Sequence, residues 1–112
     1  MQIQEEGYLL RVFVGESDKH GHVPLYEAIV LKALEAGLAG ATVLRGLMGF
    51  GEHSVLHTAK VLRLSEDLPM VVEIVDSLEK IEAFLPTLDA MVHEGLVTLE
   101  NVRVIQPRSG RV

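Results

Sequence analysis

The sequence predicts an α+β domain with four antiparallel strands and two helices, ordered strand-helix-strand, strand-helix-strand. Three observations lead to this fold class. Four runs rich in Val, Ile and Leu have the length of strands, two segments carry apolar residues at helical spacing, and glycines stand at several of the boundaries. We therefore expect a single domain over residues 1–112, in which both helices cover one face of a four-stranded sheet.

The first half of the chain divides into a strand, a helix and a second strand. Residues 8–14 form a β-branched and aromatic run typical of a strand, and the polar stretch 16–22 is expected to be a loop. Residues 25–36 repeat apolar side chains at helical spacing, and Gly37 is a suitable C-terminal stop. A second strand is expected over residues 41–48, running into a glycine-rich segment.

The second half repeats this order after a long connection over about residues 52–68. The pattern leaves open whether the middle of that connection is extended or a short helix. Residues 70–75 (Met-Val-Val-Glu-Ile-Val) predict the third strand and residues 96–105 the fourth. The polar tail at residues 107–112 is expected to be loose. Together the elements predict the ferredoxin-like βαββαβ arrangement.

The second helix lies between these last two strands. Asp76 and Glu79 have the spacing of a capping box, which predicts that the helix begins there. Four apolar residues at helical spacing are expected to form its buried stripe: Ile81, Phe84, Leu85 and Leu88. Pro86 falls inside that stripe and has no backbone N–H to donate, so we expect a kink or an early end at this position.

The strands also predict what lies on the sheet face away from the helices. In none of these strands is either set of alternating residues polar throughout. Each of the first three strands carries one charge, at Arg11, Arg45 and Glu73. In the usual strand order Glu73 would face both arginines as cross-strand neighbours. Because exposed apolar faces usually mark contacts, we expect a symmetric homo-oligomer interface here. The alternative is an exposed face with ordinary solvated charges.

Composition excludes several classes of protein. With no cysteine there is no disulfide framework and no thiolate site. The formal net charge of −6 argues against a nucleic-acid binder, and only Tyr8 and Phe13 are available for base stacking on the strands. Apolar runs are shorter than the ~20 residues of a membrane span, and the polar N-terminal residues resemble no signal peptide. We therefore expect a cytoplasmic protein that neither binds nucleic acid nor inserts into a membrane.

The segment 45–51 (Arg-Gly-Leu-Met-Gly-Phe-Gly) is the most informative stretch for function. Glycines at a strand end let the backbone approach a ligand closely and can direct N–H groups at an anion. The segment has neither the lysine of a P-loop nor the G-x-G-x-x-G spacing of dinucleotide folds. From the residues alone, a ligand-binding loop and a bulged turn both remain open.

A strand that ends in Gly-Phe-Gly before a long loop resembles the PII (GlnB-like) signalling superfamily, and further motifs resemble its smaller branch, domain of unknown function 190. The motifs are residues 15–20 (Gly-Glu-Ser-Asp-Lys-His), 45–51, 64–69 (Leu-Ser-Glu-Asp-Leu-Pro) and 72–76 (Val-Glu-Ile-Val-Asp). The resemblance implies a trimer with its sheets facing inward and an adenine nucleotide in each intersubunit cleft. It also implies a signalling protein rather than an enzyme, with a membrane transporter as a candidate target.

Three departures from the classical PII pattern bear on the ligand. Glu52-His53 replaces the Arg-Gln of classical members, whose Gln helps to bind 2-oxoglutarate through a metal, so that effector is not expected. Residues 52–69 contain no tyrosine for uridylylation. The classical glycine-rich loop with its phosphate-binding lysine is reduced to residues 93–95 (His-Glu-Gly). The resemblance with these departures favours AMP or ADP over ATP, and no obligatory metal.

The resemblance assigns ligand-binding roles to a set of residues. These are Arg45, Gly46, Gly49, Phe50, Gly51, His53, Lys19, His20, Arg103 and Arg108. The glycine segment would direct backbone N–H groups at phosphate, with Phe50 near the base. Arg45 would contact phosphate or pair with Glu73, and Lys19 and His20 would supply charge or simply be solvated. Nucleotide binding is expected to order residues 52–68 and present them to a partner protein.

The sequence also bears on two other functions, metal binding and catalysis. The chain has five histidines, and His53 and His57 would share one face if their segment were helical. The alternative function is therefore a divalent-metal-binding trimer similar to the CutA family. Catalysis is not expected, because there is no serine, histidine and acid set placed for nucleophilic chemistry and no stretch that matches a ferredoxin-like acylphosphatase.

Overall fold

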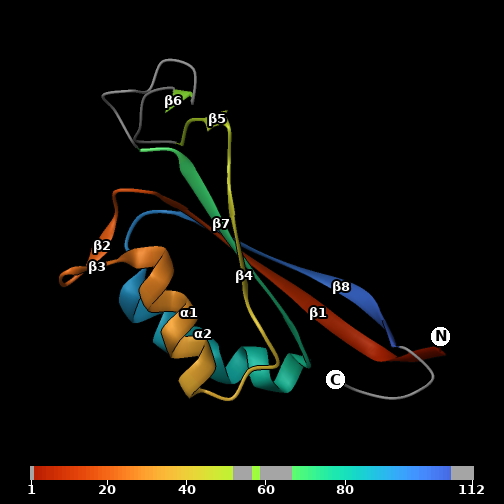
Figure 1. The fold of residues 1–112 in the computed structure, drawn as a ribbon. Coiled ribbons are helices and arrows are strands. Elements are labelled where there is room, and N and C mark those ends of the chain that lie inside the picture. The colour runs from red at the N-terminus through yellow and green to blue at the C-terminus, as the bar shows by residue number, and fades with distance from the viewer. Residues whose placement is uncertain (1, 52–56, 59–66, 107–112) are drawn as a thin grey trace.

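The computed structural model describes residues 2–51, 57–58 and 67–106, which form two layers. One layer is a four-stranded antiparallel sheet, and both helices cover the same face of it (Figure 1). The strand order is β4-β7-β1-β8, from Thr42–Arg45, Pro69–Asp76, Gln2–Gly15 and Leu96–Gln106. The helices are α1, Leu25–Glu35, and α2, Leu78–Met91. The predicted fold class is confirmed.

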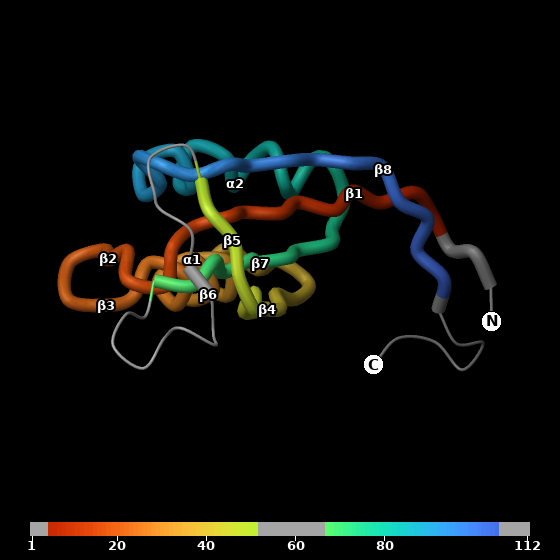
Figure 2. Tube along the Cα trace, turned by 90° about the horizontal axis from the view of Figure 1, so that it is seen from above, coloured from red at the N-terminus to blue at the C-terminus, as the bar shows by residue number. Residues whose placement is uncertain are grey.

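Strand β1 begins at Gln2 rather than at residue 8 as predicted. Its pairing with β7 starts only at Tyr8, opposite Asp76, whereas its pairing with β8 reaches Gln106. The polar first residues show no strand pattern, so only this cross-strand pairing identifies them as a strand. Figures 1 and 2 show the resulting β1–β8 ribbon extending past the other elements.

Two short strand pairs lie outside the main sheet. The predicted loop 16–22 contains β2, Lys19–His20, which pairs with β3, Val23–Pro24. The predicted strand 41–48 ends at Arg45, and the chain resumes pairing as β5, Met48–Gly49, with β6, His57–Thr58. The break has a local cause. The backbone N–H of Gly46 donates to the carbonyl of Pro69 at 2.7 Å, where the chain turns out of the ladder.

The core lies between the sheet and the two helices and is almost entirely aliphatic. Alternate residues of the two central strands point into it, as expected for a half-covered sheet. These are Leu10, Val12 and Val14 of β1 and Met70, Val72 and Ile74 of β7. The helices contribute Ile29, Ile81 and Phe84, each fully buried or nearly so. This packing holds α2 against β1 and thereby positions the turn that follows α2.

Helix α2 differs from its prediction in three details. Ser77, not Asp76, is its N-cap residue, because Ser77 Oγ accepts from Lys80 N whereas Asp76 accepts from the N–H groups of Ala39 and Ser77. The helix also continues through Pro86 to Met91. Leu85, predicted to be buried, is 36% exposed. The buried residues Phe84, Leu88 and Met91 on either side of the proline hold the helix in place.

Removal of the Ser77 cap is expected to lower the free energy of unfolding. The Ser77→Ala variant should lose about 1 kcal/mol, because the first turn of α2 then has one fewer acceptor for its N–H groups. Chemical denaturation of the purified variant measures this loss. Ser77→Asp is the control and should be nearly neutral, since aspartate is an equally good cap. Equal losses in both variants would argue against the cap.

The sheet face away from the helices carries an ion-pair network on an apolar surface. Arg11 bridges Glu73 at 2.8 Å and Glu100 at 2.6 Å, which confirms the predicted pairing of Arg11 with Glu73. The hydrogen bond to Glu73 is the main cause that raises the pKa of Arg11 above its ordinary value. The surrounding residues alternate with the core positions: Leu9, Phe13, Leu44, Val71, Val75 and Leu96.

The predicted pairing of Arg45 with Glu73 is wrong. The register places Thr42 opposite Glu73, and Arg45 opposite Met70. Met70 points into the core, so its cross-strand partner Arg45 lies on the helix-covered face of the sheet. Glu73 lies on the opposite face. The Arg45 guanidinium instead bridges Glu16 at 2.6 Å.

Candidate functional site

A cleft of about 620 Å³ opens at the end of the sheet farthest from Gln2 and Gln106. Three strand ends and the turn after α2 meet there (Figure 1). The lining residues are Phe13, Val14, Gly15, Asp18, Gly49, Phe50, Gly51, Asp67, Pro69, His93, Glu94, Gly95 and Leu96. The volume lies within the range of about 300–1,000 Å³ that is usual for small-molecule sites.

The glycines of the 45–51 segment let it pass close to the start of β7. A β-carbon at Gly46 would lie 2.7 Å from Pro69 Cγ, and one at Gly49 would lie 3.0 Å from the same atom. Both distances are shorter than ordinary van der Waals contact, so larger residues there would displace the segment. The glycine pattern therefore has a packing role as well as any role toward a ligand.

The β1–β2 turn is tied to the start of β7 by hydrogen bonds. Asp67 Oδ1 accepts from the backbone N–H of Ser17 at 3.0 Å and from its hydroxyl at 2.8 Å. The backbone N–H of Glu16 donates to the carbonyl of Leu68 at 2.8 Å. Asp18 Oδ2 accepts from the N–H of Gly15 at 2.9 Å. These bonds hold two carboxylates, Asp18 and Asp67, in place on the wall of the cleft.

The ion pair between Arg45 and Glu16 lies next to this network. Glu16 is mostly buried, and its Oε2 receives Arg45 Nη2. Its other oxygen, Oε1, is buried and has no hydrogen-bond partner within the part of the chain that the structure describes. Because Arg45 is paired in this way, it brings no uncompensated positive charge to the cleft.

The predicted ligand-binding residues are only partly gathered at this cleft. Gly49, Phe50 and Gly51 line it, and the Phe50 side chain is 76% exposed. Lys19 and His20 lie exposed on the β2–β3 hairpin and do not line it.

One further predicted position, Arg103, lies away from the cleft. Arg103 stands opposite Glu6 on the β1–β8 ribbon, at the other end of the sheet. His53 and Arg108 lie outside the described residues.

The alternative metal site has no support in the part of the chain that the structure describes. His57 is part of β6, a strand rather than the helix that would align it with His53. Within residues 2–51, 57–58 and 67–106, no group of three or more His, Asp or Glu side chains is arranged to hold a metal ion.

Sequence reasoning missed the acidic part of the cleft wall. Asp18 and Asp67 line the cleft beside Glu94 and His93, and no lysine or arginine is among the described lining residues. Asp18 and Asp67 fall within the motifs 15–20 and 64–69, which were the available signal. Nothing in the sequence indicates that the two motifs meet, because they are joined only through the folded sheet.

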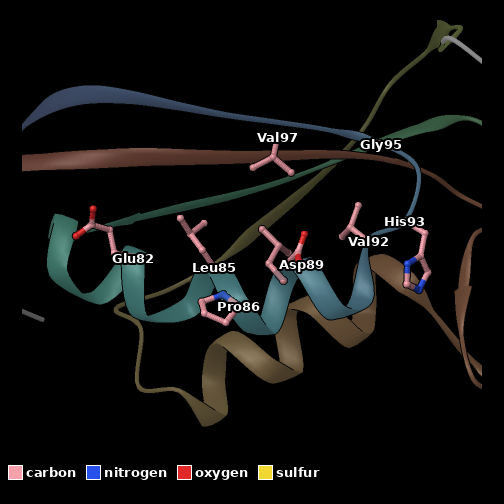
Figure 3. Close-up of a pocket in the computed structure, with 9 residues that line it drawn as sticks. Glu82, Leu85, Pro86, Asp89, Val92, His93, Gly95 and Val97 are labelled. Atoms are coloured by element: carbon pink, nitrogen blue, oxygen red, sulfur yellow. The ribbon is translucent and has the colours of Figure 1, made fainter.

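A second cavity, a groove of about 510 Å³, runs between α2 and β8. Figure 3 shows Leu85, Pro86 and Asp89 of α2 and Val97 of β8 around it, with Glu82 toward the end away from the turn. Its lining is mainly apolar, which explains why Leu85 is partly exposed. His93 and Gly95 line both the groove and the cleft, so the turn after α2 is their common wall.

The described helices include none that is long and apolar enough to cross a membrane. The structure combines a ferredoxin-like sheet with a glycine-rich segment that lines the cleft at one end of it. The family model described as DUF190 (Uncharacterized ACR, COG1993) matches residues 7–104. The chain belongs to this family.

Known relatives agree with this assignment. The chain is 42% identical over 97 residues to a UPF0166 protein of Aquifex aeolicus (strain VF5), covering 87% of this chain and 91% of the relative. It is 32% identical over 97 residues to a UPF0166 protein of Methanocaldococcus jannaschii, covering 86% and 89%.

Solved structures show the same fold. CPII, a nitrogen regulatory PII-like protein from Thiomonas intermedia K12, superimposes with a TM-score of 0.63 and 20% identity over 92% of each chain. That structure contains ADP, AMP and bicarbonate bound to CPII.

Proposed function

We propose that this protein is a PII-like regulatory protein that binds an adenine nucleotide, AMP or ADP, in a cleft between neighbouring copies of the chain. The observation that carries the proposal is the cleft beside Gly49, Phe50 and Gly51. Further support comes from CPII, which has the same fold and was solved with ADP and AMP bound.

The cleft offers groups suited to each part of a nucleotide. The glycine segment lets phosphate oxygens approach the backbone closely. Phe50, with most of its side chain exposed at the cleft, is placed to stack on an adenine ring. Phe13, Pro69 and Leu96 add apolar wall area. The function proposed for the cleft is nucleotide binding.

The proposal places the site between copies because the described part of one copy supplies little positive charge at the cleft. The described lining of the cleft has no lysine or arginine, whereas Arg103 stands exposed on the β1–β8 ribbon at the opposite end of the sheet. A neighbouring copy that brings Arg103, and also Lys19, His20 or Arg108, to this cleft would neutralise the phosphate. The apolar sheet face around Arg11 is the surface proposed to join three copies.

The assembly is tested by its mass in solution. Light scattering of the purified protein should give the mass of three chains of 12.3 kDa each. A monomer at micromolar concentration would contradict the intersubunit site.

The proposal includes a regulatory output through residues 52–68, which follow the glycine segment directly in the chain. Nucleotide binding is proposed to order this stretch so that a partner protein, such as a membrane transporter, recognises it. Backbone amide hydrogen exchange across residues 52–66 should therefore slow when AMP or ADP is added. Unchanged exchange under saturating nucleotide would exclude this part of the proposal.

Calorimetric titration tests nucleotide binding itself. AMP, ADP, ATP and cyclic AMP would each be titrated into the protein with and without Mg²⁺. We expect saturable binding of AMP or ADP with one nucleotide per chain. If none of the four nucleotides gives a saturable heat of binding, the proposed function is ruled out.

A further inference from the structure

We infer that the acidic wall of the cleft makes the protein select nucleotides by phosphate number, and that Glu94 is the residue that sets this selectivity. The inference rests on the proposed function. It goes further by assigning a specificity role to a residue of the turn between α2 and β8. The ligand class is a nucleoside with few phosphates, a monophosphate before a triphosphate.

The first observation is the charge on the cleft wall. Its titratable lining residues are Asp18, Asp67, Glu94 and His93. Among the described residues, Arg45 of the glycine-rich segment is held by Glu16 at 2.6 Å and does not line the cleft. A phosphate chain that enters from solvent therefore meets three carboxylates within its own subunit.

The second observation separates Glu94 from the other two carboxylates. Asp18 and Asp67 accept backbone N–H groups from Gly15 and Ser17. Replacing either aspartate would disturb the β1–β2 turn. Glu94 is exposed and, within the described chain, forms no hydrogen bond or ion pair. A substitution at Glu94 therefore changes the charge of the wall and leaves its packing intact.

Electrostatics then fixes the direction of the preference. Each added phosphate brings further negative charge toward a wall that already carries it, and the repulsion between like charges a few ångströms apart costs binding affinity. A neighbouring copy that contributes one or two cationic side chains neutralises the charge of a single phosphate more completely than the charge of three phosphates. Salt screens charges at a partly open site, so the preference should shrink as ionic strength rises.

The experiment compares Glu94→Lys with Glu82→Lys, a control that makes the same change of charge elsewhere. Glu82 lines the groove between α2 and β8 and not the cleft (Figure 3). Titrations with AMP, ADP and ATP are carried out without Mg²⁺ at low and high salt. We expect the wild type to bind AMP about tenfold more tightly than ATP at low salt. Glu94→Lys should narrow or reverse that ratio, whereas Glu82→Lys should leave it unchanged.

Further measurements separate the effect of charge at residue 94 on the AMP/ATP affinity ratio from effects of side-chain shape and of misfolding. Glu94→Gln keeps the shape of the side chain and should give an intermediate ratio. Addition of Mg²⁺ should improve ATP binding to the wild type, because the cation neutralises the phosphates. Thermal unfolding of each variant verifies that it is folded.

Two results would overturn the inference alone and leave the proposed function standing. Wild-type protein that binds ATP as tightly as AMP at low salt would show that the wall does not select by phosphate number. Equal changes of the AMP/ATP ratio in Glu94→Lys and Glu82→Lys would show an effect of net charge and not of the cleft. Failure of the wild type to bind any nucleotide would instead contradict the proposed function, and the inference with it.

Discussion

A Gly51→Asp variant is expected to lose at least about a hundredfold in affinity for AMP and ADP while keeping its fold. Gly51 lines the cleft directly after Phe50 and is exposed there. An aspartate would place a fourth carboxylate beside the phosphate, and like charges about 4 Å apart near a protein surface repel by several kcal/mol. A loss of about 2.7 kcal/mol already corresponds to a hundredfold. Calorimetric titration of the variant measures the change.

The matched control is Gly40→Asp, which makes the same substitution away from the cleft. A β-carbon at Gly40 would meet no atom within 4 Å, and the residue is exposed. This variant should bind nucleotide as the wild type does. Undiminished binding by Gly51→Asp would place the nucleotide away from the glycine segment and contradict the proposed site.

A Gly95→Val variant is expected to be less stable by about 3 kcal/mol, at the upper end of the usual cost of overpacking. A β-carbon at Gly95 would lie 2.7 Å from the carbonyl oxygen of Phe13 and 3.2 Å from Val92 Cγ1. The first contact is with the backbone of β1, which pairs with both β7 and β8 at this residue, so it cannot relax by a side-chain rotation. The turn after α2 would have to move, and with it the wall shared by cleft and groove. Urea unfolding measures the loss of stability.

Gly37→Ala measures the cost of backbone conformation without steric contact, whereas Gly95, with a φ of +157°, combines the two. Gly37 has a φ of +77°, but a β-carbon there would meet nothing within 4 Å. Its substitution should cost about 1–2 kcal/mol from backbone strain alone. If the Gly95→Val variant is as stable as Gly37→Ala or more stable, the turn after α2 can move to accept the added side chain, and the expected steric cost is wrong.

Much of the fold was predictable because the alternation of apolar residues is strong. Residues 70–75 read as a strand with two apolar faces, and the structure places Val72 and Ile74 in the core and Glu73 on the opposite face. The same alternation in residues 8–14 placed Arg11 on the face of Glu73, and the two side chains form the expected ion pair. Period-two patterns determine the face of a residue even when the sheet partner is unknown.

The errors occurred where long-range contacts override local pattern. Residues 2–7 form a strand only because β8 pairs with them. Arg45 pairs with Glu16, 29 positions away in the chain. The register of β4 against β7 places Arg45 opposite Met70 and not opposite Glu73. Helix α2 does not end early at Pro86, because the core holds both of its halves. None of these contacts has a signal in the local sequence.

The candidate site was predictable to a similar extent. The Gly49-Phe50-Gly51 stretch signals a close approach of the backbone, and the structure places it at a cleft. The acidic residues across the cleft come from the β1–β2 turn, the start of β7 and the turn after α2, which only the folded sheet brings together. Where Arg103 of a second copy would lie is a question of assembly, for which one chain contains no direct signal.

A crystal structure of the protein, from crystals grown in the presence of AMP, is the most direct test of the nucleotide site. We predict density for AMP between Phe50 and the turn at residues 93–95, with its phosphate beside Gly49 and Gly51 and an arginine from a second copy within reach. AMP bound elsewhere on the chain, with this cleft free of nucleotide at saturating concentration, would contradict the account.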